Sequence, residues 1–345
     1  MKVLVTGSEG YIGTVLARHL LESGHDVTGL DTCYFSNRKF LGELPEYELL
    51  KCDIRDIKES QLKGFDAICH LAALSNDPAG ALISEITEDI NYLGTVSLAE
   101  KAKRAGVGRF LFSGSCSIYG AGDTSSFLTE EAEFNPVTAY GRSKVLAERD
   151  LSKLADDSFS PVFLRNATAY GTSPRLRLDL VVNNLVAWAY TTKKIAMTSD
   201  GTPWRPIVHV NDICLAFKCA LEAPEPAVHN QAFNIGRTDA NYQVKEIAEA
   251  VGKVITDAEI TFGKSSGETP DKRSYRVSFE KAKNKLPGFA PRWTLMDGIR
   301  EMYKSYQQFG LKEEHLNGNQ FITLNRYKYL LDRQEITKDF RWTVN

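Results

Sequence analysis

The feature that most constrains this 345-residue chain is a glycine-rich turn near its start, Gly7-Ser-Glu-Gly10-Tyr-Ile-Gly13. The turn follows a β-rich apolar run at residues 2–6 and precedes a helical pattern of apolar residues over 14–22. Glycines at this spacing allow a tight turn, close approach of a pyrophosphate to the backbone, and close packing of the helix on the strand. The N-terminus of the helix would present free N–H groups to the phosphates. A second strand at 26–30 leads into Asp31, whose carboxylate suits the ribose of an adenosine. The sequence therefore predicts a dinucleotide site that opens a βαβ unit.

Beyond this unit, strand-like and helical segments continue to alternate. Further strands are expected at residues 47–52, 66–73, 109–113 and 161–165, with helices at 89–105 and 139–154 and a short edge strand at 232–235. Such alternation predicts an α/β fold with a Rossmann-type, doubly wound parallel sheet. Cofactors of these sheets lie outside the carboxyl ends of the strands, where small side chains let a ring system pack against the backbone.

The later part of the chain is less regular, and we expect it to cross between two domains more than once. The dinucleotide-binding domain is predicted to comprise residues 1–172, joined by about 207–236. Residues 173–206 and 237–305 are predicted to form a smaller α/β C-terminal substrate domain. Residues 306–345, rich in Leu, Tyr, Arg and Lys, are predicted to be a helical extension.

Composition narrows the class of protein. The formal net charge is −2 and a basic excess is absent, which argues against nucleic acid as a partner. The chain enters a strand at once and contains no apolar run of membrane-spanning length, so we expect no signal peptide, no membrane and a cytoplasmic location. The six cysteines are scattered and expected to be reduced, and the six histidines lack metal-ligand spacing, so no metal is assigned.

The second informative pattern is Tyr140-Gly-Arg-Ser-Lys144 within the expected helix 139–154. Residues four apart share a helix face, so the phenol and the ammonium group would lie side by side. A nearby cation lowers the pKa of a phenol from its usual value near 10, which provides a proton acceptor for the oxidation of an alcohol. The ordinary alternative is a packed tyrosine beside a solvated lysine. Ser115 favours chemistry, because it follows the strand 109–113 at the same sheet edge as the glycine turn.

Together these residues resemble the extended short-chain dehydrogenase/reductase family, specifically its NAD-dependent nucleotide-sugar epimerase and dehydratase branch. The resemblance covers roughly residues 1–300. It rests on Thr6 with the glycine turn, Ser115 four residues before Tyr119-Gly120, Tyr140-x-x-x-Lys144, and Arg-Pro-Ile-Val-His-Val-Asn-Asp at 205–212. The resemblance implies that Tyr140 is the acid/base, that Lys144 lowers its pKa and binds the nicotinamide ribose, and that Ser115 orients the sugar hydroxyl.

The cofactor implied is NAD, because Asp31 would repel the 2′-phosphate of NADP and pair with a free hydroxyl. The resemblance also places Asp53 and Ile54 near the adenine, and gives Asn91 the task of helping to hold the catalytic helix. The full predicted cofactor set is Gly7, Gly10, Tyr11, Ile12, Gly13, Asp31, Asp53, Ile54, Leu71, Ala72, Ala73, Asn91, Ser113, Tyr140 and Lys144.

The predicted partner is a nucleotide-diphosphate sugar. Asn183-Asn184-Leu185 resembles a segment that touches the nucleotide diphosphate in galactose-type epimerases, and Asn166 is expected to touch substrate as well. Arg205 and Arg273 resemble the family's two diphosphate-binding arginines, whose forked guanidinium groups bind phosphate oxygens bidentately. The alternative for each arginine is a surface salt bridge, and diphosphate binding is the favoured interpretation. A homodimer, paired through the helices near Asn91 and Tyr140, is implied by the resemblance alone.

The residues after Ser115 bear on the reaction. A 4,6-dehydratase of the family has an Asp-Glu pair there, whereas this chain has Cys116 and Ser117, which replace a carboxylate pair poorly. A 4-epimerase needs no further acid or base, so epimerisation at C4 is the predicted function. Cys116 is either a small buried residue or a catalytic thiol. A dehydratase or reductase of the same family and a non-catalytic NAD-binding sensor or scaffold remain the alternatives.

Overall fold

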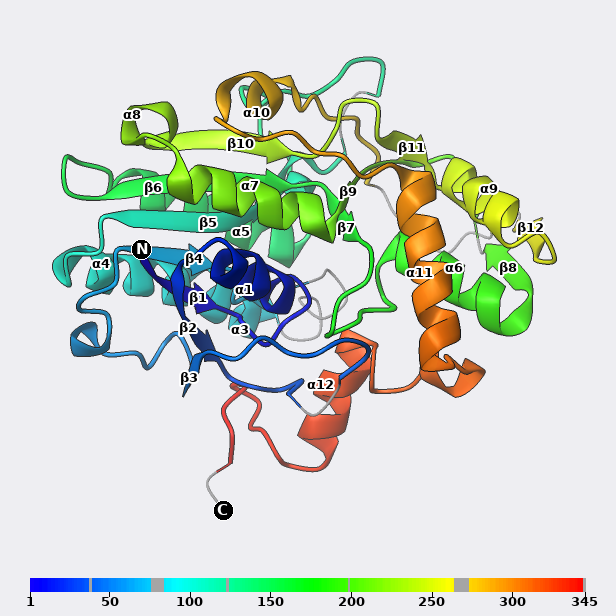
Figure 1. Cartoon of the computed structure of the whole chain (residues 1–345), viewed down its shortest axis with the longest axis horizontal. Coiled ribbons are helices and arrows are strands. Elements are labelled where there is room, and N and C mark those ends of the chain that lie inside the picture. The colour runs from blue at the N-terminus through cyan, green and yellow to red at the C-terminus, as the bar shows by residue number, and fades with distance from the viewer. Residues whose placement is uncertain (37–38, 76–83, 122–123, 198, 264–272, 344–345) are drawn as a thin grey trace.

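The structure is a computed structural model that describes residues 1–36, 39–75, 84–121, 124–197, 199–263 and 273–343. Its main element is a seven-stranded sheet in the order β10-β6-β5-β4-β1-β2-β3, in which every neighbouring pair is parallel (Figure 1). The strands are β1 (Lys2–Thr6), β2 (Asp26–Asp31), β3 (Glu48–Lys51), β4 (Ala67–His70), β5 (Arg109–Ser115), β6 (Ser160–Asn166) and β10 (Gln231–Ile235). The predicted Rossmann-type sheet, including its edge strand, is confirmed.

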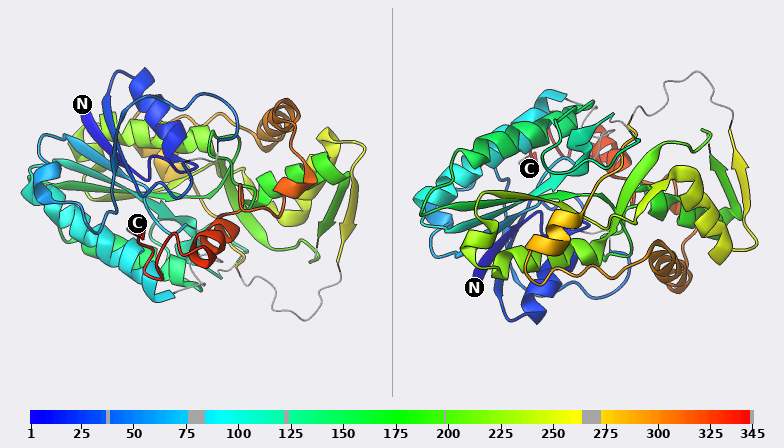
Figure 2. Two further views of the ribbon diagram at one scale, coloured as in Figure 1. Left: turned by 90° about the horizontal axis from the view of Figure 1, so that it is seen from below. Right: turned by 90° about the horizontal axis from the view of Figure 1, so that it is seen from above.

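Helices cover both faces of this sheet (Figure 2). One face carries α1 (Gly13–Glu22), α7 (Val210–Glu222), α8 (Glu225–Val228) and α10 (Glu280–Lys285); the other carries α3 (Ser84–Glu88), a π-turn η2 (Asp89–Gly94), α4 (Thr95–Arg104) and α5 (Ala139–Ser152). The alternation of β1 explains the two layers. Val3 and Val5 pack in the core beneath α1 and α7, whereas Leu4 packs in the core beneath α4 and α5.

A third hydrophobic core lies beyond the carboxyl ends of the strands (Figure 1). Here β7 (Thr168–Tyr170), β9 (Trp204–His209) and β11 (Asn241–Gln243) form a small sheet, and β8 (Lys194–Met197) pairs with β12 (Glu259–Phe262). Helices α6 (Val181–Thr192), α9 (Val244–Val254) and α11 (Leu295–Phe309) pack around this core. Helix α11 runs from Leu295 to Phe309, so it crosses the predicted boundary between residues 305 and 306. The predicted domain boundaries stay a prediction.

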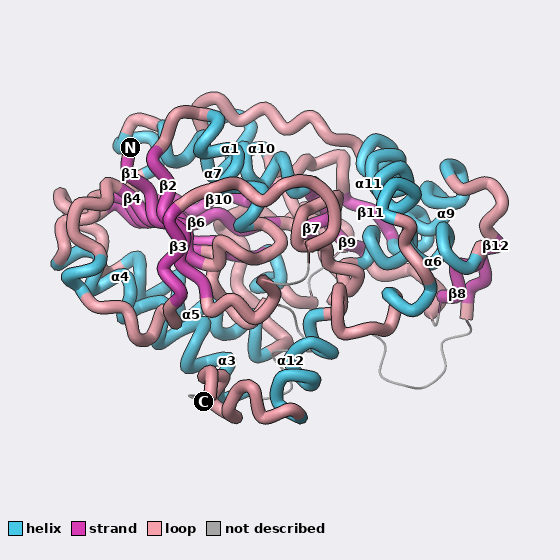
Figure 3. Tube along the Cα trace, turned by 60° about the horizontal axis from the view of Figure 1, so that its bottom comes forward, coloured by secondary structure: helices cyan, strands magenta, loops and turns pink. Residues whose placement is uncertain are grey.

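The final segment turns back from α11 toward the main sheet (Figure 3). It contains a short 3₁₀ turn, η4 (Glu313–His315), and one helix, α12 (Thr323–Asp332), followed by irregular chain. Further 3₁₀ turns are η1 (Glu59–Gln61) and η3 (Cys116–Tyr119). Tyr327 and Leu330 of α12, together with Phe340, join the core beneath α4 and α5, so this segment is packed against the dinucleotide-binding half.

Candidate functional site

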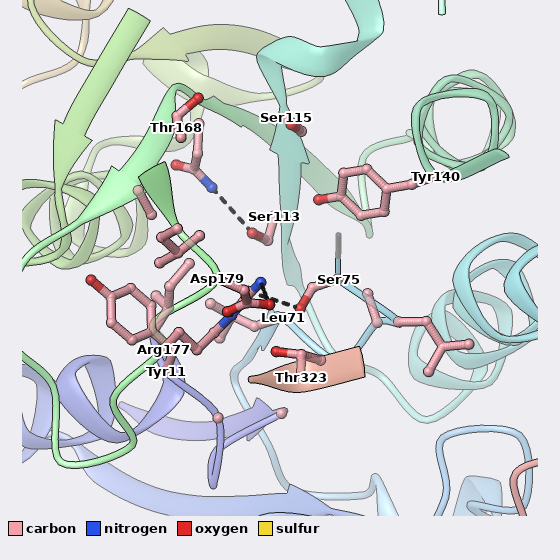
Figure 4. Close-up of a pocket in the computed structure, with 18 of the residues that line it drawn as sticks. Tyr11, Leu71, Ser75, Ser113, Ser115, Tyr140, Thr168, Arg177, Asp179 and Thr323 are labelled. Atoms are coloured by element: carbon pink, nitrogen blue, oxygen red, sulfur yellow. Dashed lines mark hydrogen bonds and ion pairs between the residues drawn. The ribbon is translucent and has the colours of Figure 1, made fainter. Parts of the chain in front are cut away.

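A cavity of about 820 Å³ opens at the carboxyl ends of β1, β2, β4 and β5 and extends to the second unit (Figure 4). The strand order changes direction between β1 and β4, which is where sheets of this kind bind their ligands. The predicted residues that line the cavity are Gly7, Gly10, Tyr11, Ile12, Gly13, Asp31, Asp53, Ile54, Leu71, Ala72, Ala73, Ser113, Ser115, Ser117, Tyr140, Lys144, Asn166, Arg205 and Arg273. Those that do not line it are Asn91, Cys116, Asn183, Asn184 and Leu185.

The glycine turn requires glycine for steric reasons. Gly7 has φ +73°, a conformation that other residues rarely adopt, and a Cβ there would meet the Ala72 backbone nitrogen at 2.8 Å. A Cβ on Gly13 would lie 2.0 Å from the Gly7 carbonyl oxygen. The turn is anchored by the Gly7 N–H, which donates to the Leu30 carbonyl at 2.8 Å. These contacts bring backbone to the cavity wall, where a pyrophosphate fits against the N-terminus of α1.

Asp31 lies at the end of β2, beside the glycine turn. Its carboxylate accepts hydrogen bonds from the backbone N–H of Cys33 at 2.7 Å and of Glu9 at 3.0 Å. Burial nevertheless raises the pKa of Asp31 to about 6. A ribose hydroxyl donating to this carboxylate would favour its charged form. The residues present therefore fit the adenosine ribose of a dinucleotide.

A buried ion pair that the sequence analysis did not identify faces the same end of the cavity. Arg175 lies 2.6 Å from Glu9 of the glycine turn, and both side chains line the cavity. The Nε and Nη1 atoms of Arg175 are buried without a hydrogen-bond partner, so donors remain for an anionic ligand. Two residues further on, Arg177 forms a second buried pair with Asp179. The sequence pattern that could have indicated these ion pairs is the run Arg-Leu-Arg-Leu-Asp at 175–179, which ends two residues before α6 begins.

Tyr140 and Lys144 lie one turn apart near the start of α5, where the Thr138 hydroxyl caps the helix by accepting from the Gly141 N–H at 3.0 Å. The phenol of Tyr140 points into the cavity toward Ser113 and Ser115 of β5 (Figure 4). Lys144 is buried, with its Nζ 5.8 Å from the centre of the Tyr140 ring. Burial lowers the pKa of Lys144 to about 7. The cation is therefore near its titration point beside the phenol.

Lys144 is fixed by the strand below it, since its Nζ donates to the Ser113 carbonyl at 2.8 Å. Hydroxyl groups follow along this strand end. The Ser117 hydroxyl donates to the Ser115 oxygen at 2.9 Å, and Asn166 donates to the Ser113 oxygen at 3.1 Å. The phenol, the serine hydroxyls and the amide together line the space where a substrate hydroxyl would be held and deprotonated.

The predicted residues outside the cavity wall make other contacts. Cys116 is buried, its thiol lies 3.2 Å from the Arg165 carbonyl oxygen, and burial raises its pKa far above the ordinary value. Asn91 exchanges hydrogen bonds with the backbone of Leu74 at 2.8 and 3.1 Å and donates to Ser143 of α5 at 3.3 Å. Its amide thus ties the loop after β4 to the helix that carries Tyr140.

The predicted substrate residues divide in the same way. The Asn183 side chain holds the chain before α6, accepting from the Gly171 N–H at 3.0 Å and donating to the Arg177 carbonyl at 3.0 Å. Asn184 donates to the Leu178 carbonyl at 2.9 Å, and Leu185 packs against the third core. Arg205 and Arg273, by contrast, both line the cavity. The Arg205 Nη1 atom donates to the Trp204 carbonyl at 2.8 Å and to the Arg273 carbonyl. The Arg205 side chain therefore links β9 to the backbone at Arg273.

Within the ranges that the structure describes, no three His, Cys, Asp or Glu side chains gather as a metal ion would require. In the same part of the chain, no helix combines the length and apolar character needed to cross a membrane.

Comparisons with known proteins agree with this geometry. The model of the NAD-dependent epimerase/dehydratase family matches residues 3–236. The UDP-glucose 4-epimerase of Corynebacterium glutamicum is 31% identical over 324 residues, covering 87% of this chain and 94% of that protein. The UDP-glucuronic acid decarboxylase 1 of Arabidopsis thaliana is 28% identical, covering 92% and 72% respectively. The structure of MoeE5 in complex with UDP-glucuronic acid and NAD superimposes with a TM-score of 0.76 at 25% identity, over 89% of this chain and 99% of that chain. The chain is therefore an NAD-dependent enzyme of the epimerase/dehydratase family.

Proposed function

We propose that this enzyme is a nucleotide-sugar 4-epimerase, which oxidises the C4 hydroxyl of the sugar and then restores it with inverted configuration. The observation that carries the proposal is the combination of Tyr140, Lys144 and Ser115 with the uncharged pair Cys116 and Ser117. The first three supply what alcohol oxidation requires, and the last two lack the carboxylates that elimination of water requires. Relatives that are UDP-glucose 4-epimerases, such as that of Corynebacterium glutamicum, support the same reaction.

In this mechanism, the Ser115 hydroxyl is hydrogen-bonded to the reacting sugar oxygen and thereby holds it beside the phenol. Tyr140, as phenolate, removes the hydroxyl proton, and a protonated Lys144 stabilises that phenolate. NAD, which the glycine turn and Asp31 would hold, would supply the acceptor and then the donor of the hydride. After the transient ketone has rotated in the cavity to present its other face, Tyr140 gives its proton back to the oxygen. The chain therefore uses a single acid/base in both directions.

The carboxylates of the cavity support epimerisation over elimination. Among the described lining residues they are Glu9, Asp31, Asp53, Asp179 and Asp200. None of these belongs to the segment 113–120 or to α5, where the reacting carbon is held. Asp179 is paired with Arg177, and Asp200 accepts from the N–H and hydroxyl of Thr202. We therefore propose Tyr140, whose phenol points toward Ser115 (Figure 4), as the acid/base of the reaction.

The other end of the cavity suits the nucleotide diphosphate. Arg205 and Arg273 approach it from β9 and from the chain before Tyr275, so we propose that their guanidinium groups bind the two phosphates. The sugar then extends toward Tyr140. UDP-glucose is the first substrate to test, because UDP-sugars are bound or named in the relatives above.

The test is incubation of the purified enzyme with UDP-glucose, and then with other nucleotide sugars, in deuterated water. Epimerisation at C4 yields a product that carries no solvent deuterium on carbon, because the hydride comes from the sugar itself. Deuterium on a carbon beside the transient carbonyl would replace the proposal with enolisation. Loss of water or of carbon dioxide would identify a dehydratase or a decarboxylase instead, and unchanged sugar with bound NAD would favour a sensor.

We further propose a homodimer in the cytoplasm. The helices η2, α4 and α5 lie side by side on one face, and Leu93 on that face is 52% exposed. The cysteines support a reducing compartment, since all six are free. Light scattering of wild type and of Leu93→Glu tests the dimer, which is expected to dissociate in the variant.

A further inference from the structure

The last part of the chain forms one wall of the cavity. Thr323 and Tyr327 of α12 line it together with Asp31, Tyr34 and Ile54, the residues at its adenosine end. Tyr327 is buried, and its ring meets the rings of Tyr34 at 6.0 Å and of Phe340 at 5.1 Å between centres. Aromatic side chains from the loop after β2 and from the C-terminal segment therefore form one continuous apolar surface.

Hydrogen bonds fasten this segment to the loop after β2. The Tyr34 hydroxyl donates to the Phe340 carbonyl at 2.5 Å, and the Trp342 indole N–H donates to the Thr32 carbonyl at 2.6 Å. Arg326 of α12 likewise donates to the Tyr34 carbonyl at 2.7 Å. Neither the loop nor the C-terminal segment can move outward without breaking these bonds.

The carboxylate of Asp53, just after β3, is bound by two arginines that contact the C-terminal segment or belong to it. Arg55 donates to its carboxylate from the backbone N–H at 2.8 Å, from Nε at 3.0 Å and from Nη2 at 2.7 Å, while Arg341 lies 3.2 Å away. A carboxylate has about four acceptor positions, so these contacts use its capacity. Arg55 also donates to the Asp339 carbonyl at 3.0 Å. The residue that the family resemblance places near the adenine thus anchors the C-terminal segment.

A second link joins α12 to the middle of the cavity. Arg177 donates to both oxygens of Asp179 at 3.0 Å and to the Ser75 hydroxyl at 3.2 Å, and Thr323 is hydrogen-bonded to Asp179 (Figure 4). The chain of contacts runs from the first turn of α12 across the cavity wall to the loop after β4. The start of α12 is therefore coupled to the walls on both sides of the dinucleotide site.

We propose that residues 320–343 are a clasp that closes the adenosine end of the NAD site and sets the rate at which NAD leaves. The proposal rests on NAD binding and does not depend on which reaction follows. Release of NAD requires α12 and the segment 339–342 to separate from Tyr34 and Asp53 first. A clasp of this kind keeps the reduced cofactor in place until the hydride has been returned.

The experiment measures exchange of bound radiolabelled NAD against excess unlabelled NAD, without any sugar, in full-length proteins. Two variants open the clasp: Tyr327→Leu at the cavity wall, and Arg341→Ala combined with Trp342→Leu at the surface. The matched control is Lys328→Ala, because Lys328 lies on the same helix and is exposed. Exchange is expected to be about tenfold faster or more in both opened variants, since loss of binding contacts acts mainly on dissociation. In the control it stays within about twofold of wild type, as for most surface substitutions.

Circular dichroism and thermal melting confirm that each variant is folded before its exchange rate is compared. If Tyr327→Leu fails to fold, the surface double variant decides the question alone. Exchange rates equal to wild type in the folded variants would overturn the proposal. Because no sugar is present, an enzyme that retains NAD through the clasp but does not epimerise UDP-glucose leaves this inference intact and refutes only the proposed function.

Discussion

The cofactor end and the substrate end of the cavity are built in different ways. The residues proposed to bind the cofactor and to act in catalysis come from the carboxyl ends of β1, β2, β4 and β5, neighbouring strands of one parallel sheet, and from α5 packed against it. The two arginines proposed to bind the diphosphate, Arg205 and Arg273, and the start of α6 come from separate segments of the second unit. Geometry at the first end is thus fixed by local strand–turn units, whereas geometry at the second depends on the packing of segments far apart in the chain.

The two ends also differ in how they hold charge. At the first end Lys144 donates to a backbone carbonyl, Asp31 accepts from backbone N–H groups, and burial moves the pKa of each toward neutrality. At the second end the groups proposed to bind the diphosphate are arginines, which stay protonated. Catalysis and cofactor binding should therefore respond to pH near neutrality, while binding of the diphosphate should not.

Tyr140→Phe is expected to have the largest effect and to separate catalysis from cofactor binding. The substitution removes the proton acceptor and leaves the ring in the cavity wall, so kcat should fall by about 10³-fold, within the range for loss of a general base. The NAD content per chain should stay as in wild type. Turnover of UDP-glucose and the bound NAD of the purified protein are the two measurements. A variant that retains full turnover would remove Tyr140 from the mechanism.

Lys144→Met tests whether the buried charge supports turnover while lowering the free energy of unfolding. Turnover should fall by about 10²-fold, because the phenolate loses its cation. The folded pKa of Lys144, about 7, lies below the unfolded value near 10.4, so the unfolded chain binds more protons between these values. The free energy of unfolding of the NAD-free chain therefore gains up to about 1.4 kcal/mol per pH unit as the pH rises above 7, and this gain is absent below 7.

Urea unfolding of NAD-free wild type and Lys144→Met, measured between about pH 6 and pH 10, checks this dependence. The variant should show a flatter pH profile and, below pH 7, a higher midpoint than wild type, because methionine carries no charge to desolvate. Identical slopes in the two proteins would mean that Lys144 stays charged within the fold.

Arg205→Gln examines the substrate end by itself. Loss of a charged donor to the diphosphate should raise KM for UDP-glucose about 10- to 100-fold, with kcat changed far less. Arg237→Gln is the matched control, since Arg237 pairs with Asp239 at the surface and does not line the cavity. A fall in kcat with unchanged KM in Arg205→Gln would place Arg205 in the chemical step and blur the division between the two ends.

How much of the site the sequence could reveal follows from the same division. Gly7, Gly13, Asp31 and the pair Tyr140 and Lys144 are spaced by one strand–turn–helix unit or one helical turn, so local rules place them correctly at one cavity. The amides of Asn183 and Asn184 were expected at the diphosphate, but their hydrogen bonds go to backbone carbonyls before α6. Sequence shows that an amide is present and does not show which of two neighbouring acceptors it meets.

The residues that the sequence did not indicate were missed for a related reason. Glu9 pairs with Arg175 across 166 positions and Tyr34 with Phe340 across 306, so no spacing pattern connects them. The fold itself was easier to predict, because apolar alternation and turn residues recur in every βα unit. What joins distant segments is a matter of packing, and no pattern within residues 306–343 indicates that α12 lies against the cavity.

Asp31 provides the smallest and most selective test, the pH dependence of NAD binding. Its folded pKa of about 6 lies above the ordinary carboxyl value, so the NAD-free chain holds a proton on Asp31 below pH 6 that a ribose-bound carboxylate must release. The Kd for NAD should therefore be flat above pH 6 and rise by up to about tenfold per pH unit below it. Calorimetric titration of wild type and Asp31→Asn measures this: the variant should bind NAD more weakly and without that slope. Arginines do not titrate in this range, and neither does the diphosphate of UDP-glucose, which is esterified at both ends. Binding of UDP-glucose by Tyr140→Phe should therefore lack this slope between the same pH values, and a parallel slope would show that the two ends of the cavity are not independent.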